Sequence, residues 1–172
     1  MDLMRYADIA YDDIVNGTGF GATIFMQGCP HHCAGCHNPS TWDFSGGHIF
    51  DDEAFNELIE YYHKRPSATR LSISGGEPLT SQNNNCNNAI AICGFFKLSR
   101  PDIKIWLWTG YKFEDFTQEQ KVILSCIDVL IDGPFIRSEK DLTLPFRGSA
   151  NQRVIDVKKT LKSGHITLWQ ND

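Results

Sequence analysis

The sequence predicts a single α/β domain built on a parallel sheet. Two observations carry this prediction: short apolar runs alternate with segments of helical periodicity, and an unusual loop follows each apolar run. At 172 residues the chain is long enough for one domain. It is well short of the ~250 residues of a complete eight-unit α/β barrel, so any barrel here has to be incomplete. With no linker or internal repeat, residues 1–172 are expected to form one domain.

The alternation gives four strands connected by three helices. The strands are expected at residues 22–26, 70–74, 102–108 and 127–133. The helices are expected at residues 51–65, 89–96 and 118–126. Asp51 is the expected N-cap of the first helix, and Thr117 with Gln120 forms a capping box for the third. Gly94 in the second helix is expected at a close packing contact. The part 140–172 has no clear periodicity and is expected to be irregular, with one or two strands.

Composition narrows the class of protein. The balance of 16 Lys and Arg against 21 Asp and Glu gives a net charge of −5, which argues against nucleic acid or an anionic membrane surface as partner. No run of eighteen apolar residues exists and the N-terminus is acidic, so a cytoplasmic protein is expected. In a reducing compartment clustered cysteines favour metal or catalysis, and scattered ones favour burial. The scattered ones are Cys86, Cys93 and Cys126.

The loop 28–38, GCPHHCAGCHN, has the spacing of a metal site. Cys29, Cys33 and Cys36 form C-x3-C-x2-C, a compact arc of three thiols on one loop. Zinc would need a fourth ligand, which one of the neighbouring histidines could supply. The candidates are His31, His32 and His37. An iron–sulfur cluster held by three thiolates would leave one iron open. The loop alone leaves zinc and iron equally possible.

A second loop favours iron and sulfide. Structural zinc sites usually draw ligand pairs from two places in the chain, and no second Cys/His pair at short spacing follows. Instead, the strand 70–74 runs into Gly75, Gly76 and Glu77, where a ligand can approach the backbone beside a carboxylate. Such a ledge suits the amine of an amino acid. A non-protein ligand held there could occupy the open iron.

These residues resemble the radical S-adenosylmethionine family, whose signature cysteine spacing and Gly-Gly-Glu motif both occur here. Further blocks are similar to the activating proteins of the anaerobic ribonucleoside-triphosphate reductase. They are DIVNGTG, GCPHHCAGCHNPSTW, SGGEPL, IWLWTGYKFED, DVLIDGPF and RGSANQR, and they span residues 13–153 in the family's order. The resemblance implies an incomplete (β/α) barrel of the radical S-adenosylmethionine type.

The resemblance also implies an oxidoreductase activity. A [4Fe-4S] cluster with three cysteine ligands would bind S-adenosylmethionine at its open fourth iron. An electron from a low-potential donor such as flavodoxin would cleave that cofactor to methionine and a 5′-deoxyadenosyl radical. The radical would abstract a hydrogen atom from a glycine of the reductase's glycyl radical subunit, which makes that subunit the protein partner.

The resemblance assigns residue roles only at positions of this chain that match the family's motifs. Cys29, Cys33 and Cys36 are implied to be the cluster ligands. The methionine end of the cofactor is assigned to Gly75, Gly76 and Glu77. Thr109 and Asp132, at the ends of two later strands, are candidates for further cofactor contacts, although both could instead be turn residues. The histidines beside the cysteines are expected to be loop residues near the cluster, not ligands.

Four positions depart from the family pattern, and two other functions stay open. The departures are Thr18 where proline is usual, Gly21 where arginine is usual, His37 where Tyr or Phe is usual, and Phe146 where tryptophan is common. The same cofactor pair could serve pyruvate formate-lyase or a small molecule. A zinc-stabilised interaction module without a reaction is the alternative from a different class.

Overall fold

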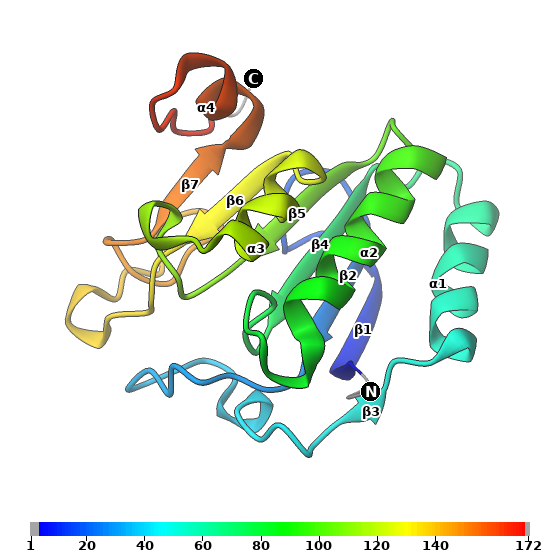
Figure 1. The fold of residues 1–172 in the computed structure, drawn as a ribbon, viewed down its shortest axis with the longest axis horizontal. Helices are drawn as coiled ribbons and strands as arrows, with labels where there is room; N and C mark the ends of the chain where they lie inside the picture. The colour runs from blue at the N-terminus through cyan, green and yellow to red at the C-terminus, as the bar shows by residue number, and fades with distance from the viewer. Residues whose placement is uncertain (1–3, 171–172) are drawn as a thin grey trace.

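One mixed sheet organises the part of the chain that the computed structural model describes, residues 4–170. Within these residues seven strands follow the order β3-β1-β2-β4-β5-β6-β7 (Figure 1). Their bounds are β1 Arg5–Asp13, β2 Gly21–Met26, β3 His48–Ile49, β4 Arg70–Gly75, β5 Lys104–Trp108, β6 Val129–Asp132 and β7 Arg153–Asp156. The ends of the predicted domain, residues 1–3 and 171–172, lie outside the described residues.

The four predicted strands form the centre of this sheet. β2, β4, β5 and β6 run parallel to one another, as the alternation predicts. β1 and β3 on one side and β7 on the other add antiparallel edges. The α/β class with parallel strands is therefore confirmed for the centre, whereas an all-parallel sheet is wrong at both edges. β1 and β3 were not predicted.

Four α-helices connect or follow these strands within residues 4–170. Their bounds are α1 Asp52–Lys64, α2 Asn85–Ser99, α3 Gln118–Lys121 and α4 Val157–Ser163, and a 3-10 helix Val122–Ser125 continues α3. Both predicted caps are confirmed: Asp51 accepts from the Ala54 N–H at 3.0 Å, and Thr117 forms the capping box with Gln120. The prediction for the part 140–172 is wrong in one respect, since α4 lies within it. Asp156 caps α4 by accepting from the Lys159 N–H at 2.9 Å.

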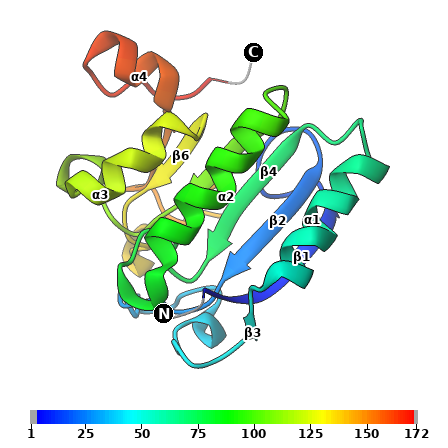
Figure 2. The ribbon, with the colours of Figure 1, turned by 45° about the vertical axis from the view of Figure 1, so that its right-hand side comes forward.

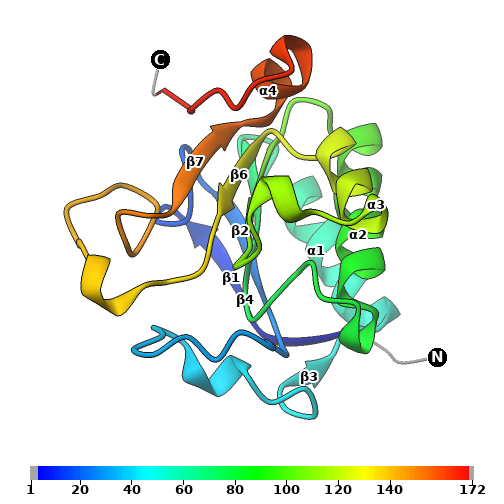
Figure 3. The same cartoon turned by 60° about the vertical axis from the view of Figure 1, so that its left-hand side comes forward.

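The helices α1, α2 and α3 cover one face of the sheet (Figure 2). Their apolar sides, with Leu58 of α1 and Phe96 of α2 fully buried, pack on alternate strand residues such as Ile105 and Leu107. Trp106 points to the other face, where it forms a smaller cluster. The loops that follow β1, β2 and β6 all project from that second face (Figure 3). One face thus carries the main core and the other carries the loops with unusual composition.

The scattered cysteines and the helical glycine can be compared with expectation. Cys86 and Cys93 are buried as predicted, and Cys126 is half-buried. The predicted close contact at Gly94 is wrong, because a Cβ there would meet nothing nearer than the Cys126 sulfur at 3.8 Å. No helix among residues 4–170 combines the length and apolar character needed to cross a membrane.

Candidate cluster and cofactor site

A cavity of about 550 Å³ opens where the parallel strands end. It collects most of the residues singled out in the sequence, although they come from three different loops. These are Cys29, Cys33, Cys36, Gly75, Gly76, Glu77 and Thr109. The carboxyl ends of parallel strands meet at one edge of a sheet, and ligands bind there in α/β proteins. The structure therefore brings seven of the eight predicted site residues to one cavity.

The cysteine loop is pinned at its base beside β2. The Gly28 N–H donates to Thr41 O at 2.8 Å, and the Cys29 N–H donates to Trp42 O at 3.2 Å. Gly28 has a φ of +92°, and a Cβ there would lie 2.3 Å from the ring of Phe44. Only glycine therefore lets the chain turn out of β2 at this point. The turn directs the cysteines into the cavity at the end of the sheet.

The three thiols differ in environment. Cys29 is buried, which together with the nearby Glu77 carboxylate raises the pKa of its thiol to about 11. Cys33 and Cys36 are half-buried. Metals bind the thiolate, so loading this site has to release the Cys29 proton.

The donor set fits an iron–sulfur cluster. Three thiols from one loop line one cavity, and thiolates are the ligands that such clusters take. Across residues 4–170, no three His, Cys, Asp or Glu side chains are already gathered tightly enough to hold a single metal ion. A cluster binds each thiolate through a different iron, so its three ligands need not converge on one point as the ligands of a single ion do.

Gly75 and Gly76 are required by the protein itself. A Cβ on Gly75 would lie 2.6 Å from Met26 N, and one on Gly76 would lie 2.4 Å from Gly28 O. The loop after β4 crosses the end of β2 in direct contact, with the Gly76 N–H donating to Met26 O at 2.7 Å. This crossing places Glu77 beside the cysteine loop. The sequence interpretation, which attributed both glycines to a ligand's approach, missed this backbone contact.

Glu77 lies at the junction of three loops. Its side chain is fully buried. One carboxylate oxygen accepts from the Leu79 N–H at 2.8 Å and from the Thr109 hydroxyl at 2.7 Å. The other accepts from the Gly110 N–H at 2.7 Å and lies 2.7 Å from His31 Nε2. A carboxylate offers about four acceptor positions, so the protein already uses them all. An ammonium group at this carboxylate would have to displace one of these partners.

His31 is the residue that sequence reasoning placed near the site without giving it a partner. Its ring packs edge-on against Tyr111, with centroids 4.7 Å apart. A Cβ on Gly110 would lie 2.5 Å from the His31 ring, so the glycine admits the imidazole. His31 and Glu77 are 46 positions apart, and no sequence spacing signals the contact. His31 thus links the cysteine loop to the loops after β4 and β5.

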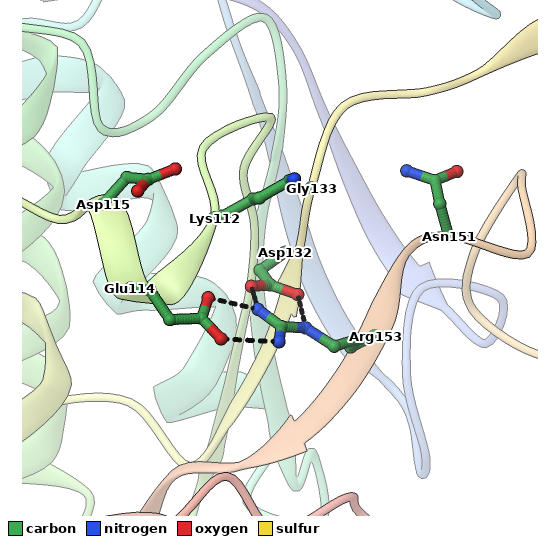
Figure 4. Close-up of a pocket in the computed structure, with 7 residues that line it drawn as sticks. All are labelled: Lys112, Glu114, Asp115, Asp132, Gly133, Asn151 and Arg153. Atoms are coloured by element: carbon green, nitrogen blue, oxygen red, sulfur yellow. Dashed lines mark hydrogen bonds and ion pairs between the residues drawn. The ribbon is translucent and has the colours of Figure 1, made fainter.

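Asp132 is the predicted site residue that the structure does not bring to this cavity. It lines an adjoining pocket of about 370 Å³ (Figure 4). Gly133 lines both this pocket and the cavity that holds the three cysteines. Its carboxylate accepts from the Phe113 N–H at 2.8 Å and from Arg153 Nε at 2.9 Å. Arg153 also donates to both oxygens of Glu114, at 2.8 and 2.7 Å. Hydrogen bonds from Arg153 lower the pKa of Glu114 to about 2.

Comparisons with known proteins identify the family. The pattern of a 4Fe-4S single cluster domain matches residues 15–155. The anaerobic ribonucleoside-triphosphate reductase-activating protein of Haemophilus influenzae is 40% identical over 153 residues, which cover 87% of this chain and 96% of that protein. The protein of the same description from phage T4 is 40% identical over 172 residues, 98% of this chain and 100% of its own. The chain belongs to the family of anaerobic ribonucleoside-triphosphate reductase-activating proteins.

The matched region of this family member contains every predicted site residue. Residues 15–155 begin at the cavity-lining Val15 and end within β7, beyond Arg153. The Escherichia coli K12 protein of the same description is 38% identical over 155 residues, 88% of this chain and 97% of that protein. The resemblance drawn from short motifs is therefore confirmed over most of the chain.

Proposed function

We propose that this chain is a radical S-adenosylmethionine oxidoreductase that activates the anaerobic ribonucleoside-triphosphate reductase. It would bind a [4Fe-4S] cluster, cleave S-adenosylmethionine reductively, and so generate a glycyl radical on the reductase. The observation that carries the proposal is the shared cavity: three thiols of one loop and the Gly75–Glu77 segment line it together. The similarity to anaerobic ribonucleoside-triphosphate reductase-activating proteins supports the same partner.

The fold is proposed to be an incomplete (β/α) barrel formed by residues 1–172. Three strand–helix units, β2–α1, β4–α2 and β5–α3, support this assignment, because helices of such units cover the outer face of a curved sheet. The cavity would then lie on the inner side, because its lining includes residues of the loops after β1, β2 and β6. These loops project from the face of the sheet opposite the helices (Figure 3). An incomplete barrel leaves this mouth open to a protein substrate.

When bound, the cluster and S-adenosylmethionine would supply reductive cleavage by one electron from the external donor, which gives methionine and a 5′-deoxyadenosyl radical; this radical would take a hydrogen atom from the substrate glycine. The chain's own residues hold and orient these groups. Cys29, Cys33 and Cys36 are the proposed cluster ligands.

The cofactor residues are proposed from their positions around the cavity. Gly75, Gly76 and Glu77 would receive the methionine end, with Thr109 beside them. Asp132 is the further candidate, and because its carboxylate is engaged by Arg153 it would act on the cofactor through the position of Gly133.

The reaction is proposed to take place in the cytoplasm with an electron donor such as flavodoxin. All six cysteines are free thiols, which suits a reducing compartment. The net charge of −5 disfavours nucleic acid or an anionic membrane as a further partner.

The test is anaerobic reconstitution with iron and sulfide, followed by reaction with S-adenosylmethionine, a chemical reductant and purified reductase. We expect 5′-deoxyadenosine and a glycyl signal in electron paramagnetic resonance. Cys33→Ala should abolish 5′-deoxyadenosine formation, because it removes one of three thiolates. Cys126→Ala is the matched control, since this thiol is half-buried outside the cavity, and it should retain full activity.

Three results would contradict the proposal. Retained cleavage in Cys33→Ala would show that the ligand set is wrong. Stoichiometric zinc without sulfide would favour the interaction module. A glycyl signal on pyruvate formate-lyase but not on the ribonucleotide reductase would change the partner.

A further inference from the structure

The loop between β1 and β2 presents two exposed aliphatic side chains at the edge of the cavity. Ile14 is 75% exposed and Val15 is 71% exposed. Val15 and its neighbour Asn16 line the cavity that holds the three cysteines. The loop projects from the same face of the sheet as the cysteine loop (Figure 3). We call residues 13–19 the rim loop.

A buried arginine fixes the backbone of the rim loop from below. Arg70 of β4 is fully buried. Its guanidinium donates to Gly17 O at 3.0 Å, to Gly19 O at 3.2 Å and to Asp13 O at 2.7 Å. It also forms an ion pair with the Asp13 carboxylate. In the sheet, Arg70 pairs with Gly21. Gly21 is the position at which the family pattern usually has an arginine.

Further hydrogen bonds fix the two residues that flank the exposed pair. The Asp13 carboxylate accepts from the Val15 N–H at 3.0 Å and from the Thr23 hydroxyl at 2.6 Å. The Ser72 hydroxyl donates to Asn16 O at 2.6 Å. The rim loop is therefore held in one conformation by buried polar groups, although its tip is apolar and exposed.

A preorganised apolar tip is a feature of binding surfaces. An exposed aliphatic pair gains free energy only when a partner covers it, and a loop that is already ordered loses little conformational entropy on binding. Since Val15 also lines the cavity, whatever covers the tip lies directly beside the cavity mouth. A protein substrate that delivers a glycine to this cavity comes close to the rim loop, because Val15 and Asn16 are part of the cavity lining.

We propose that Ile14 and Val15 form an apolar docking contact for the reductase, on the polypeptide surface next to its substrate glycine. The inference rests on the proposed function, because it takes the substrate to be a protein. The structure carries it through the position of the pair at the cavity edge and through the Arg70 network that orders the loop. A second copy of this chain is the competing occupant.

The test compares Ile14→Ser with Leu98→Ser. Leu98 lies on α2, on the helix-covered side of the sheet, and is 87% exposed, so both changes replace an exposed aliphatic side chain by the same residue. The Kd for purified reductase is measured by biolayer interferometry, which needs no turnover. Ile14→Ser should raise the Kd at least about five-fold, the effect of truncating an energetically important interface residue. Leu98→Ser should leave the Kd unchanged.

Parallel measurements separate the two proposals. The rate of 5′-deoxyadenosine formation with a chemical reductant and no reductase should be the same in Ile14→Ser and the original chain. Absence of that product from the original chain would overturn the proposed function, while the Kd comparison would still test the docking contact. An unchanged Kd in Ile14→Ser would overturn the docking contact. If the Kd is unchanged and the original chain elutes as a dimer in size-exclusion chromatography but Ile14→Ser elutes as a monomer, the tip is a self-association contact and the docking proposal is overturned.

Discussion

The replacement Glu77→Gln tests whether Glu77 organises the site. One oxygen of Glu77 accepts from the Leu79 N–H and the other from the Gly110 N–H. A glutamine amide has one oxygen and one NH₂ group. Whichever way the amide is turned, its NH₂ therefore faces one of these two main-chain donors. The variant loses one buried hydrogen bond to a charged acceptor and leaves one N–H without a partner.

The expected cost follows from these contacts. A hydrogen bond to a charged group contributes roughly 1.5–3 kcal/mol, and an unsatisfied buried donor costs about 1–3 kcal/mol. Because the two descriptions overlap, we expect the free energy of unfolding to fall by about 2–4 kcal/mol. Equilibrium urea unfolding of the cluster-free chain at neutral pH measures it, since this readout is independent of any cofactor.

The control is Glu60→Gln on α1. Glu60 is exposed and pairs with Lys64 one turn away, and solvent screens such surface pairs so that they contribute little to stability. The control should therefore leave the free energy of unfolding almost unchanged. A similarly small change in Glu77→Gln would refute the reasoning, because it would mean that the four contacts of the carboxylate do not hold the loops together.

Two further predictions concern stability away from the cavity. Gly94→Ala should raise the free energy of unfolding by up to about 1 kcal/mol, because Gly94 lies inside α2 with no atom nearer than 3.8 Å to a Cβ, and a lower melting temperature would reveal a hidden packing contact. The pair of Glu114 with Arg153 should stabilise the fold above the ordinary pKa of Glu114, 4.5, and lose this contribution as the pH falls from there toward about 2. Arg153→Gln should therefore flatten the fall in stability over that range in urea unfolding, and an unchanged slope would contradict the assignment.

The central strands and the helix caps could be predicted because their signals are local. The runs 22–26 and 127–133 are mostly apolar, which marks a central strand of a parallel sheet. The run 70–74 alternates Leu71 and Ile73 with polar residues, and a short strand is still predicted there because the run leads directly into Gly75 and Gly76. The caps at Asp51 and Thr117 depend on residues only three positions apart.

Elements without such signals were missed. β1 carries Asp8, Asp12 and Asp13, and none of its nine residues is fully buried, so its sequence lacks an apolar run. α4 has seven residues, of which Val157 and Thr160 are buried. A segment this short shows no helical periodicity, and it forms because Asp156 caps it and β7 delivers it to the sheet edge.

The site was predictable in membership and less so in its contacts. Cysteine spacing and the Gly75–Glu77 segment indicated residues that do line one cavity. The partners of Glu77 could not be inferred, because His31 and Thr109 are 46 and 32 positions away in sequence. The same limit applies to Asp132, whose engagement by Arg153 depends on the antiparallel pairing of β6 and β7. Long-range contacts of this kind are set by the topology, and no local pattern encodes them.

The most direct test of the central claim asks whether S-adenosylmethionine binds an iron that no side chain occupies. Electron–nuclear double resonance of the reduced, cluster-loaded protein with cofactor labelled with ¹⁵N at its amine reports that bond. We predict a hyperfine coupling between the label and the cluster, present in the original chain and in Cys126→Ala. Saturating cofactor without any coupling, as when a histidine or a fourth thiolate fills that position, would contradict the account.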